Sequence, residues 1–222
     1  MIITIKKHGD KENIEIYTFG RKHLGLTEKE IHKYLYGNLS DISDPFLMKG
    51  VREGVDIIRE KIRDRKTIRI ISDYDVDGVV SNYILWKAIY DLGGMIDFQI
   101  PDRMKDGYGI NENIIEKAVE DQIDTILTCA NGIAASEAIR FGKEHGLTMI
   151  ITDHHDVPFI LNEDGSKEEI LPPADVVINP KQKECKYPYP LLCGAGVAFQ
   201  FVRALYKSMG EDENKLEDLL SM

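Results

Sequence analysis

Residues 68–78, with the sequence IRIISDYDVDG, decide the fold that this chain is expected to adopt. The first half of the stretch is a short run rich in isoleucine, which is typical of a β-strand buried on both faces. Three aspartates follow at alternate positions, and they are Asp73, Asp75 and Asp77. Gly78 then opens a pattern of apolar residues at helical spacing. The stretch therefore predicts a strand, an acidic turn and a helix in direct succession, as in an α/β sheet.

The acidic turn is a candidate metal site. Ligands of α/β sheets bind beyond the carboxyl ends of the strands. In extended chain, the carboxylates of Asp75 and Asp77 are expected to point to the same side. Crowded carboxylates repel one another, and burial strengthens that repulsion. A divalent cation with oxygen ligands relieves it. A polar loop with solvated acidic residues is the alternative at this point.

The composition is that of a soluble globular protein in a reducing compartment. Of the 222 residues, 43% are hydrophobic and 30% are charged, which are ordinary values. A run of about 18 apolar residues and a basic, then apolar, N-terminus are both missing, so we expect neither a membrane span nor a signal peptide. The three cysteines are odd in number and lack C-x-x-C spacing. That pattern argues against structural zinc and favours the cytoplasm.

The net charge of −10 argues against a protein that coats nucleic acid nonspecifically. It does not exclude a nuclease, because metal-binding carboxylates add negative charge where cations neutralise it. A local basic groove can also coexist with an acidic whole.

The first 50 residues are predicted to form a hairpin and a helical lead. Two short β-like runs, at residues 2–6 and 14–19, flank a polar turn. Thr27 and Glu30 have the spacing of a capping box, which predicts a helix that reaches about Tyr36. We expect this lead, residues 1–50, to be separate from a main domain at 51–222, which opens with an amphipathic helix.

From residue 68 onward, strand patterns alternate with helix patterns, which indicates βαβ units and a mostly parallel sheet. Further strands are predicted at residues 95–100, 125–129, 147–152 and 176–178. Helices are predicted at residues 51–62, from Gly78 to Gly93, and at 114–119, 134–145 and 195–209. The expected fold class is α/β, a three-layer domain. Residues 162–173 are polar and predict a surface excursion.

Polar clusters follow three of the predicted strands. In chain order they are the aspartate triplet, Ala130-Asn131-Gly132 and Asp153-His154-His155-Asp156. The strand ends of one parallel sheet share an edge, so these clusters can meet. An isolated histidine pair is more often a surface feature than a ligand pair. This pair, however, follows an apolar strand and is expected to face the aspartate triplet, which favours a site.

Together these segments resemble the DHH phosphoesterase superfamily. The matching motifs, in family order, are DYDVDG, TCANGI, TDHHDVP and INPKQ with YPYPLLCGAGVAF. More narrowly, the chain is similar to the catalytic core of the RecJ-type single-stranded-DNA-specific exonucleases, from about residue 30 onward. The DHH tripeptide alone would be a weak signal, whereas the ordered set is a specific one.

The resemblance implies two manganese or magnesium ions held by carboxylates and a histidine. It places metal ligands at Asp75, Asp77 and His154, with Asp73 beside them. It also implies that His155 contacts the scissile phosphate and that Asp153 orients the histidine pair. Two hard cations of this kind clamp a phosphodiester, generate hydroxide and stabilise the leaving oxygen.

Two departures from the family pattern bear on activity. The family has D-N-G-I where this chain has Ala130 before Asn131, and the resemblance makes that aspartate the bridge between the two metals. An alanine offers no oxygen ligand. The family also has a fourth motif, an aspartate in a later strand, and a smaller C-terminal domain, and this chain stops at Met222 before both. We therefore expect one weak metal position or none, and little or no exonuclease activity.

Several further residues are candidate substrate contacts, each with a plainer alternative. Arg103 is a candidate phosphate contact and Tyr108 a candidate for stacking on a base, although both lie in a loop that contains glycines and incidental polar residues. Gly194 and Gly196, ahead of a helix, offer backbone N–H groups to a phosphate or simply permit close packing. Asn131 completes this set of candidates.

We read the chain as a hydrolase domain whose parent function is metal-dependent cleavage of phosphodiesters. The family expectation is 5′-to-3′ degradation of single-stranded DNA, in DNA repair and recombination. One alternative is hydrolysis of short oligonucleotides or cyclic dinucleotides within the same superfamily. Another is a catalytically degenerate domain that binds nucleic acid or a partner, and both Ala130 and the missing fourth motif leave this alternative open. The sequence leaves the oligomeric state and the choice of metal undecided.

Overall fold

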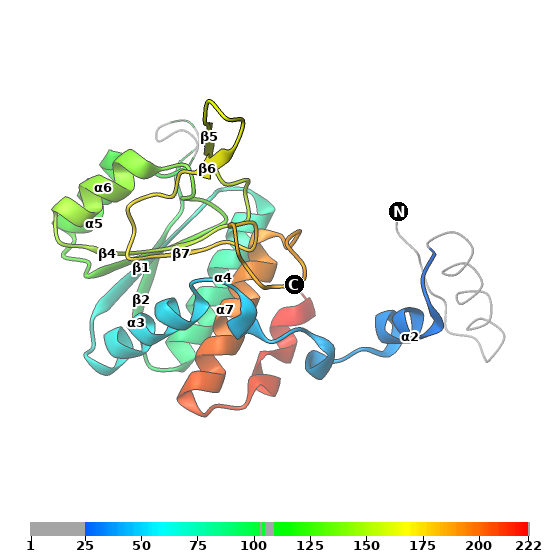
Figure 1. The fold of residues 1–222 in the computed structure, drawn as a ribbon. Coiled ribbons are helices and arrows are strands. Elements are labelled where there is room, and N and C mark those ends of the chain that lie inside the picture. The colour runs from blue at the N-terminus through cyan, green and yellow to red at the C-terminus, as the bar shows by residue number, and fades with distance from the viewer. Residues whose placement is uncertain (1–24, 103, 105–108, 222) are drawn as a thin grey trace. The chain divides into compact units, whose positions relative to one another are not determined.

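The structure is a computed structural model that describes residues 25–102, 104 and 109–221 (Figure 1). The chain divides into two compact units, Met1–Ser43 and Asp44–Met222. The hairpin predicted at residues 2–6 and 14–19 lies outside the described residues. The boundary predicted at residue 50 stays a prediction.

The described part of the first unit is a short helix followed by a turn. Helix α2 spans Glu28–Tyr36 and begins after Thr27. The Thr27 N–H donates to Glu30 Oε2 at 2.7 Å, and the Glu30 N–H donates back to Thr27 Oγ1 at 3.3 Å. The predicted capping box is therefore confirmed. A 3-10 turn, η1, follows at Leu39–Asp41.

The second unit is built on a five-stranded sheet with the order β2-β1-β3-β4-β7. The strands are β1 (Thr67–Ser72), β2 (Met95–Gln99), β3 (Thr125–Cys129), β4 (Thr148–Thr152) and β7 (Val176–Ile178). Each of the four pairings between neighbours is parallel. The predicted α/β fold class with a mostly parallel sheet is confirmed.

Helices cover both faces of this sheet (Figure 1). They are α3 (Val51–Arg63), α4 (Val76–Asp91), α5 (Glu112–Glu120), α6 (Ser136–Glu144) and α7 (Gly194–Met209), with 3-10 turns η2 (Pro45–Leu47) and η3 (Glu213–Ser221). Helices α5 and α6 lie on one face, where Ile115 and Ile139 join a buried cluster with Ile126 and Ile151 of the sheet. Helices α3, α4 and α7 lie on the other face.

Helix α4 begins two residues before the predicted start at Gly78. Asp75 is its N-cap, and the Gly78 N–H donates to Asp75 Oδ1 at 2.7 Å. This carboxylate satisfies an N–H group that the first turn leaves without a helical partner. Asp77 therefore lies in the first turn of a helix. The argument that Asp75 and Asp77 project together from extended chain is wrong.

The surface excursion predicted at residues 162–173 includes a small antiparallel hairpin. Its strands are β5 (Phe159–Leu161) and β6 (Lys167–Glu169). The hairpin begins earlier than predicted because the exposed apolar run Phe159–Leu161 pairs with the polar strand. In the part of the chain that the structure describes, helices are too short or too polar to cross a membrane.

A buried arginine ties the edge strand to the rest of the sheet. Arg69 of β1 is 8% exposed. Its Nε and Nη2 atoms donate to the two carboxylate oxygens of Asp97 on β2, at 2.8 and 2.6 Å, and its Nη1 donates to Asp121 at 2.7 Å. The two-point contact with Asp97 has the geometry that makes arginine–carboxylate pairs strong.

We expect Arg69→Leu to lower the free energy of unfolding by about 1–3 kcal/mol, because two carboxylates lose a shared, mostly buried partner. Both aspartates are partly exposed, so water can solvate them and keeps the loss below that of a fully buried pair. Urea unfolding measures the change. Arg63→Leu, which removes an exposed ion pair, is the control and should leave the stability nearly unchanged. Equal effects of the two substitutions would contradict the structural role of Arg69.

Candidate functional site

The register of the sheet brings three polar clusters to one edge. Ser72 pairs with Cys129, and Cys129 pairs with Thr152. The next residue along each strand is then Asp73, Ala130 or Asp153. These three positions are buried, with 1–2% exposure. The predicted meeting of the three clusters follows from this register, and it gives a site at the carboxyl ends of β1, β3 and β4.

Asp77 joins α4 to the beginning of α7. Its Oδ2 accepts a hydrogen bond from the Gly194 N–H at 2.7 Å, and its Oδ1 accepts one from the Ala195 N–H at 2.8 Å. A helix N-terminus carries partial positive charge and unpaired N–H groups, so it stabilises a carboxylate there. A Cβ atom at position 194 would lie 2.6 Å from the Ala130 Cβ and 2.8 Å from Asp77 Oδ2. Glycine is therefore required at 194 for this approach.

His154 presents a ring nitrogen without a hydrogen-bond partner among the described residues. Its Nδ1 is buried, 3.6 Å from Asp77 Oδ2 and 3.9 Å from Asp153 Oδ1. Buried polar atoms are normally paired, and a neutral imidazole nitrogen is the commonest protein ligand for metals. An orphaned nitrogen between two carboxylates fits a cation ligand.

Asp153 holds both histidines in place. Its Oδ1 accepts from the N–H groups of His154 and His155 at 2.7 and 3.1 Å, and lies 2.8 Å from the Nδ1 atom of His155. Its Oδ2 accepts from the Ile133 N–H at 2.9 Å. The orienting role predicted for Asp153 agrees with these contacts.

These contacts set the ionisation of the pair. Burial by itself raises the pKa of the Asp153 carboxyl, but the hydrogen bonds from His155 and the Ile133 N–H outweigh it, and the pKa lies below its ordinary value. The hydrogen bond with Asp153 raises the pKa of the His155 imidazole, against partial burial, and the charge of Asp73 adds to the rise. A negative Asp153 thus favours a proton on His155.

Asp73 and Asp75 occupy different surroundings. Asp73 is buried, and its Oδ1 accepts from the Tyr74 N–H at 2.7 Å. Asp75 is exposed and caps α4. Among the described residues, the side chains whose potential ligand atoms all lie within 4.8 Å of one another are Asp153, His154 and His155. Asp75, Asp77 and His154 do not form such a group here, so their assignment as metal ligands stays a prediction.

Ala130 occupies a backbone conformation that alanine seldom adopts. Its φ angle is +55°, in the left-handed region where aspartate and asparagine are tolerated better than other residues with a Cβ. It packs against the helix start that binds Asp77. Burial raises the pKa of the neighbouring Cys129 thiol, and the charges of Asp77 and Asp153 raise it further. The Ala130 Cβ and Asp77 Oδ2 both lie against Gly194, so a carboxylate at position 130 would begin close to that of Asp77.

A cavity of about 310 Å³ adjoins the histidine pair. Apolar side chains of Ile110, Ile133 and Ala135 form part of its lining, and His155 and Asn131 also line it. Both polar atoms of the Asn131 carboxamide are buried and have no hydrogen-bond partner among the described residues. An amide in that state marks a place where a polar ligand atom or water would be stabilised.

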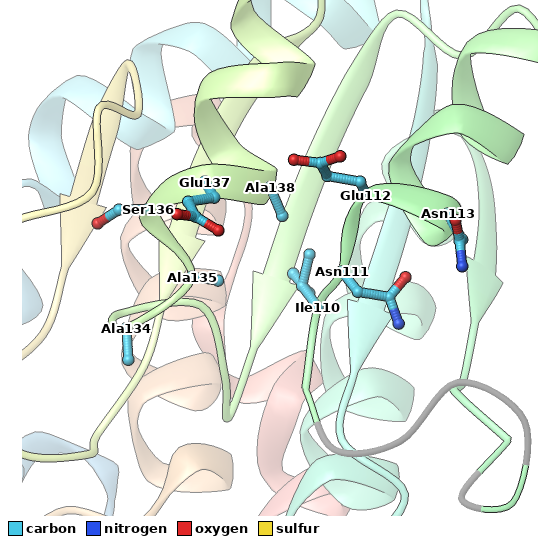
Figure 2. A pocket seen from close by; sticks show the side chains of 9 residues that line it. All are labelled: Ile110, Asn111, Glu112, Asn113, Ala134, Ala135, Ser136, Glu137 and Ala138. Carbon is cyan, nitrogen blue, oxygen red and sulfur yellow. The ribbon is translucent and has the colours of Figure 1, made fainter.

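A larger cavity, of about 770 Å³, lies beside it between the beginnings of α5 and α6 (Figure 2). Ile110, Ala134 and Ala135 line both cavities. The larger one carries the acidic side chains of Glu112 and Glu137 and none of the site histidines. We take the smaller cavity as part of the site because His155 and Asp153 line it.

The structure describes only some of the remaining residues that were predicted to contact the substrate. Arg103 and Tyr108 lie outside the described residues. The Gly194 N–H is already bonded to Asp77. A Cβ at Gly196 would lie 3.1 Å from the Leu192 side chain, which agrees with the packing alternative. Sequence reasoning missed one residue of the site, Asn179, whose Nδ2 donates to the His155 carbonyl at 2.9 Å. The INPKQ motif contains Asn179 and could have pointed to it.

Comparison with known proteins connects this site to a family. Residues 67–222 match the model of the DHH family, N-terminal domain. The single-stranded-DNA-specific exonuclease RecJ of Bacillus subtilis (strain 168) is 38% identical over 196 residues, which are 88% of this chain and 23% of that protein. The RecJ of Haemophilus influenzae is 31% identical over 198 residues, 86% of this chain and 33% of that protein.

Solved structures agree with this likeness. An exonuclease RecJ bound to manganese has a TM-score of 0.64 and 31% identity, covering 75% of this chain and 40% of that chain. RecJ from Thermus thermophilus in complex with Mn²⁺ has a TM-score of 0.59 and 26% identity, covering 90% of this chain and 28% of that chain. The chain thus spans between about a quarter and two fifths of the length of these relatives.

We expect Ala130→Val to lower the free energy of unfolding by about 2–3 kcal/mol, because a β-branched residue is strained at positive φ and its added methyls crowd the start of α7. Ala130→Asn should cost less than about 1 kcal/mol, since asparagine tolerates this conformation. Urea unfolding measures both.

Gln122→Val is the matched control, because Gln122 also has a positive φ of 58° but is exposed. It should show the backbone strain without the crowding. If Ala130→Val were as stable as the unaltered protein, position 130 would not be confined as described.

Proposed function

Because the chain belongs to the DHH family, we propose that it carries metal-binding residues of a phosphodiesterase that acts on single-stranded DNA. The RecJ relatives that match most of this chain are named as exonucleases specific for single-stranded DNA, which supports this substrate over cyclic dinucleotides. A role in DNA repair or recombination and a cytoplasmic location follow from that substrate.

The observation that carries the proposal is the buried Nδ1 of His154, which has no hydrogen-bond partner among the described residues and lies 3.6 Å from the Asp77 carboxylate. A nitrogen and a carboxylate oxygen at this separation suit a shared divalent cation. Manganese in two related structures supports Mn²⁺, with Mg²⁺ as the other hard cation that the family implies. Asp75 and Asp73 are the further proposed carboxylates. When bound, the cation would supply Lewis-acid activation of the phosphodiester and of the attacking water.

The protein's own residues would position the substrate. His155 is held by Asp153 through Nδ1, and its Nε2 would donate to a phosphate oxygen. The raised pKa of His155 favours the doubly protonated ring, which is the stronger donor. The adjoining cavity has apolar walls and the Asn131 amide, which has no hydrogen-bond partner in the described part of the chain, and it would hold the nucleoside next to that phosphate.

Ala130 limits the site. The family resemblance places a bridging carboxylate at that position, and without it two cations lack the group that offsets their mutual repulsion. We propose at most one weak metal position in this chain and correspondingly low turnover. A second function is binding of single-stranded DNA without cleavage. Two observations favour it: Ala130 offers no metal ligand, and Asp77 already accepts hydrogen bonds from two α7 N–H groups, which stabilise its carboxylate without a cation.

Ala130→Asp should tighten Mn²⁺ binding at least about tenfold, because it adds a carboxylate oxygen inside the acidic cluster. Isothermal titration calorimetry measures the affinity. Ala130→Asn is the matched control: it has the same shape and backbone preference but no charge, and its gain should be small. Two tight Mn²⁺ ions in the unaltered chain, or equal gains from Asp and Asn, would contradict the proposed role of position 130.

Degradation of a 5′-labelled single-stranded oligonucleotide in Mn²⁺ tests the function. The unaltered chain should show little or no cleavage, and Ala130→Asp should raise cleavage less than it raises metal affinity, because turnover also needs in-line positioning and exclusion of water. His154→Ala excludes a contaminating nuclease. Turnover of the unaltered chain comparable to that of a RecJ relative would refute the limit set by Ala130. An Ala130→Asp variant that binds Mn²⁺ and DNA without cleavage would favour the binding function.

A further inference from the structure

A lysine beyond the DHH motif is held against the candidate site by a buried amide. Asn179 follows β7 and is fully buried. Its Nδ2 donates to the His155 carbonyl at 2.9 Å, and its Oδ1 accepts from the Lys181 N–H at 2.9 Å. One carboxamide therefore fixes the backbone of Lys181 relative to His155. Lys181 is positioned by the fold, unlike a lysine on a free surface loop.

The ammonium group of Lys181 reaches the rim of the cavity beside His155. Its Nζ lies 2.8 Å from Asp156 Oδ1, and Asp156 lines that cavity together with Asp153 and His155. The lysine side chain is 28% exposed, whereas that of Asp156 is 94% exposed.

The charges around the cavity create a need for this cation. The chain has a net charge of −10, and the described lining of the cavity contains two aspartates and neither lysine nor arginine. A phosphate chain entering here meets repulsion unless a cation is near. Lys181 pairs with an almost fully exposed carboxylate, and such pairs contribute little to stability because water and salt screen them. Exchange of Asp156 for a phosphate is therefore easy.

We propose that Lys181 contacts a backbone phosphate of the bound strand next to the phosphate that His155 contacts, and that Asp156 competes with that phosphate for the lysine. This inference rests on the proposed binding of single-stranded DNA. Lys181 then supplies affinity and register for the strand without reading its bases. Removing Lys181 and removing Asp156 should have opposite effects on DNA affinity. The first change deletes the cation that contacts the phosphate, and the second releases that cation from its carboxylate partner.

Fluorescence anisotropy of a fluorescein-labelled oligothymidylate, in EDTA so that cleavage does not interfere, tests this at several salt concentrations. Each phosphate contact on a single strand contributes about 0.7 to the slope of log affinity against log salt. Lys181→Met should weaken binding and reduce the magnitude of the slope by about 0.7. Lys181→Arg should retain the slope. Asp156→Asn should tighten binding.

Lys143→Met is the matched control. Lys143 also pairs with an aspartate, Asp175, at 2.6 Å. It lies in the last turn of α6, and Asp175 directly precedes β7, so this pair is at the amino ends of the strands, away from the site. The substitution should leave the slope unchanged. If the unaltered chain binds and Lys181→Met has the same salt slope, the inference about Lys181 is overturned while the proposed function stands. An Asp156→Asn variant with unchanged affinity would overturn it in the same way. No binding by the unaltered chain, either in EDTA or with Ca²⁺ added to occupy the metal position, would overturn the proposed function and this inference with it.

Discussion

The site depends on one electrostatic constraint, which is that three aspartates lie near the carboxyl edge of the sheet, with Asp73 and Asp153 buried and Asp77 in the first turn of α4. Each is stabilised by backbone N–H donors: Asp73 by Tyr74, Asp77 by the beginning of α7, and Asp153 by three N–H groups, those of Ile133, His154 and His155. Backbone dipoles fixed by the fold lower the cost of burying negative charge. Helix α7 and the loops after β3 and β4 therefore have to keep their N–H groups next to these carboxylates.

The stabilisation of these aspartates by backbone N–H groups also limits which ligands the site can bind. Because both oxygens of Asp77 accept hydrogen bonds from α7, this residue joins the first and last parts of the domain as well as facing His154. A cation at His154 would share Asp77 with the helix, and additional carboxylates would decide how tightly it binds. Ala130 lies where one more carboxylate would reach this cluster. Any metal affinity would thus be coupled to the packing of α7 through Asp77.

The two sides of the site differ in charge, which bears on how a nucleic acid would lie in it. The strand ends carry the aspartates, whereas the segment after β7 brings Lys181 to the rim through the buried Asn179. The cavity beside His155 has apolar walls and an amide with no hydrogen-bond partner among the described residues. The proposed cation at His154, a lysine at the rim and a largely apolar cavity would match the alternation of phosphate and nucleoside along a strand.

Local patterns in the sequence were enough to predict the five strands of the parallel sheet, most helices, the capping box at Thr27 and Glu30, and the three clusters after the strands, but not the strands β5 and β6. These features depend on period and turn chemistry within a few residues. The start of α4 was misplaced because Asp75 caps it, so Asp77 is helical. Tertiary structure alone decided that Asp77 binds the N–H groups of Gly194 and Ala195, that Ala130 adopts a left-handed conformation and that Asn179 links Lys181 to His155. Those contacts join segments far apart in the chain, and they follow from sheet register and helix packing, which no local pattern contains.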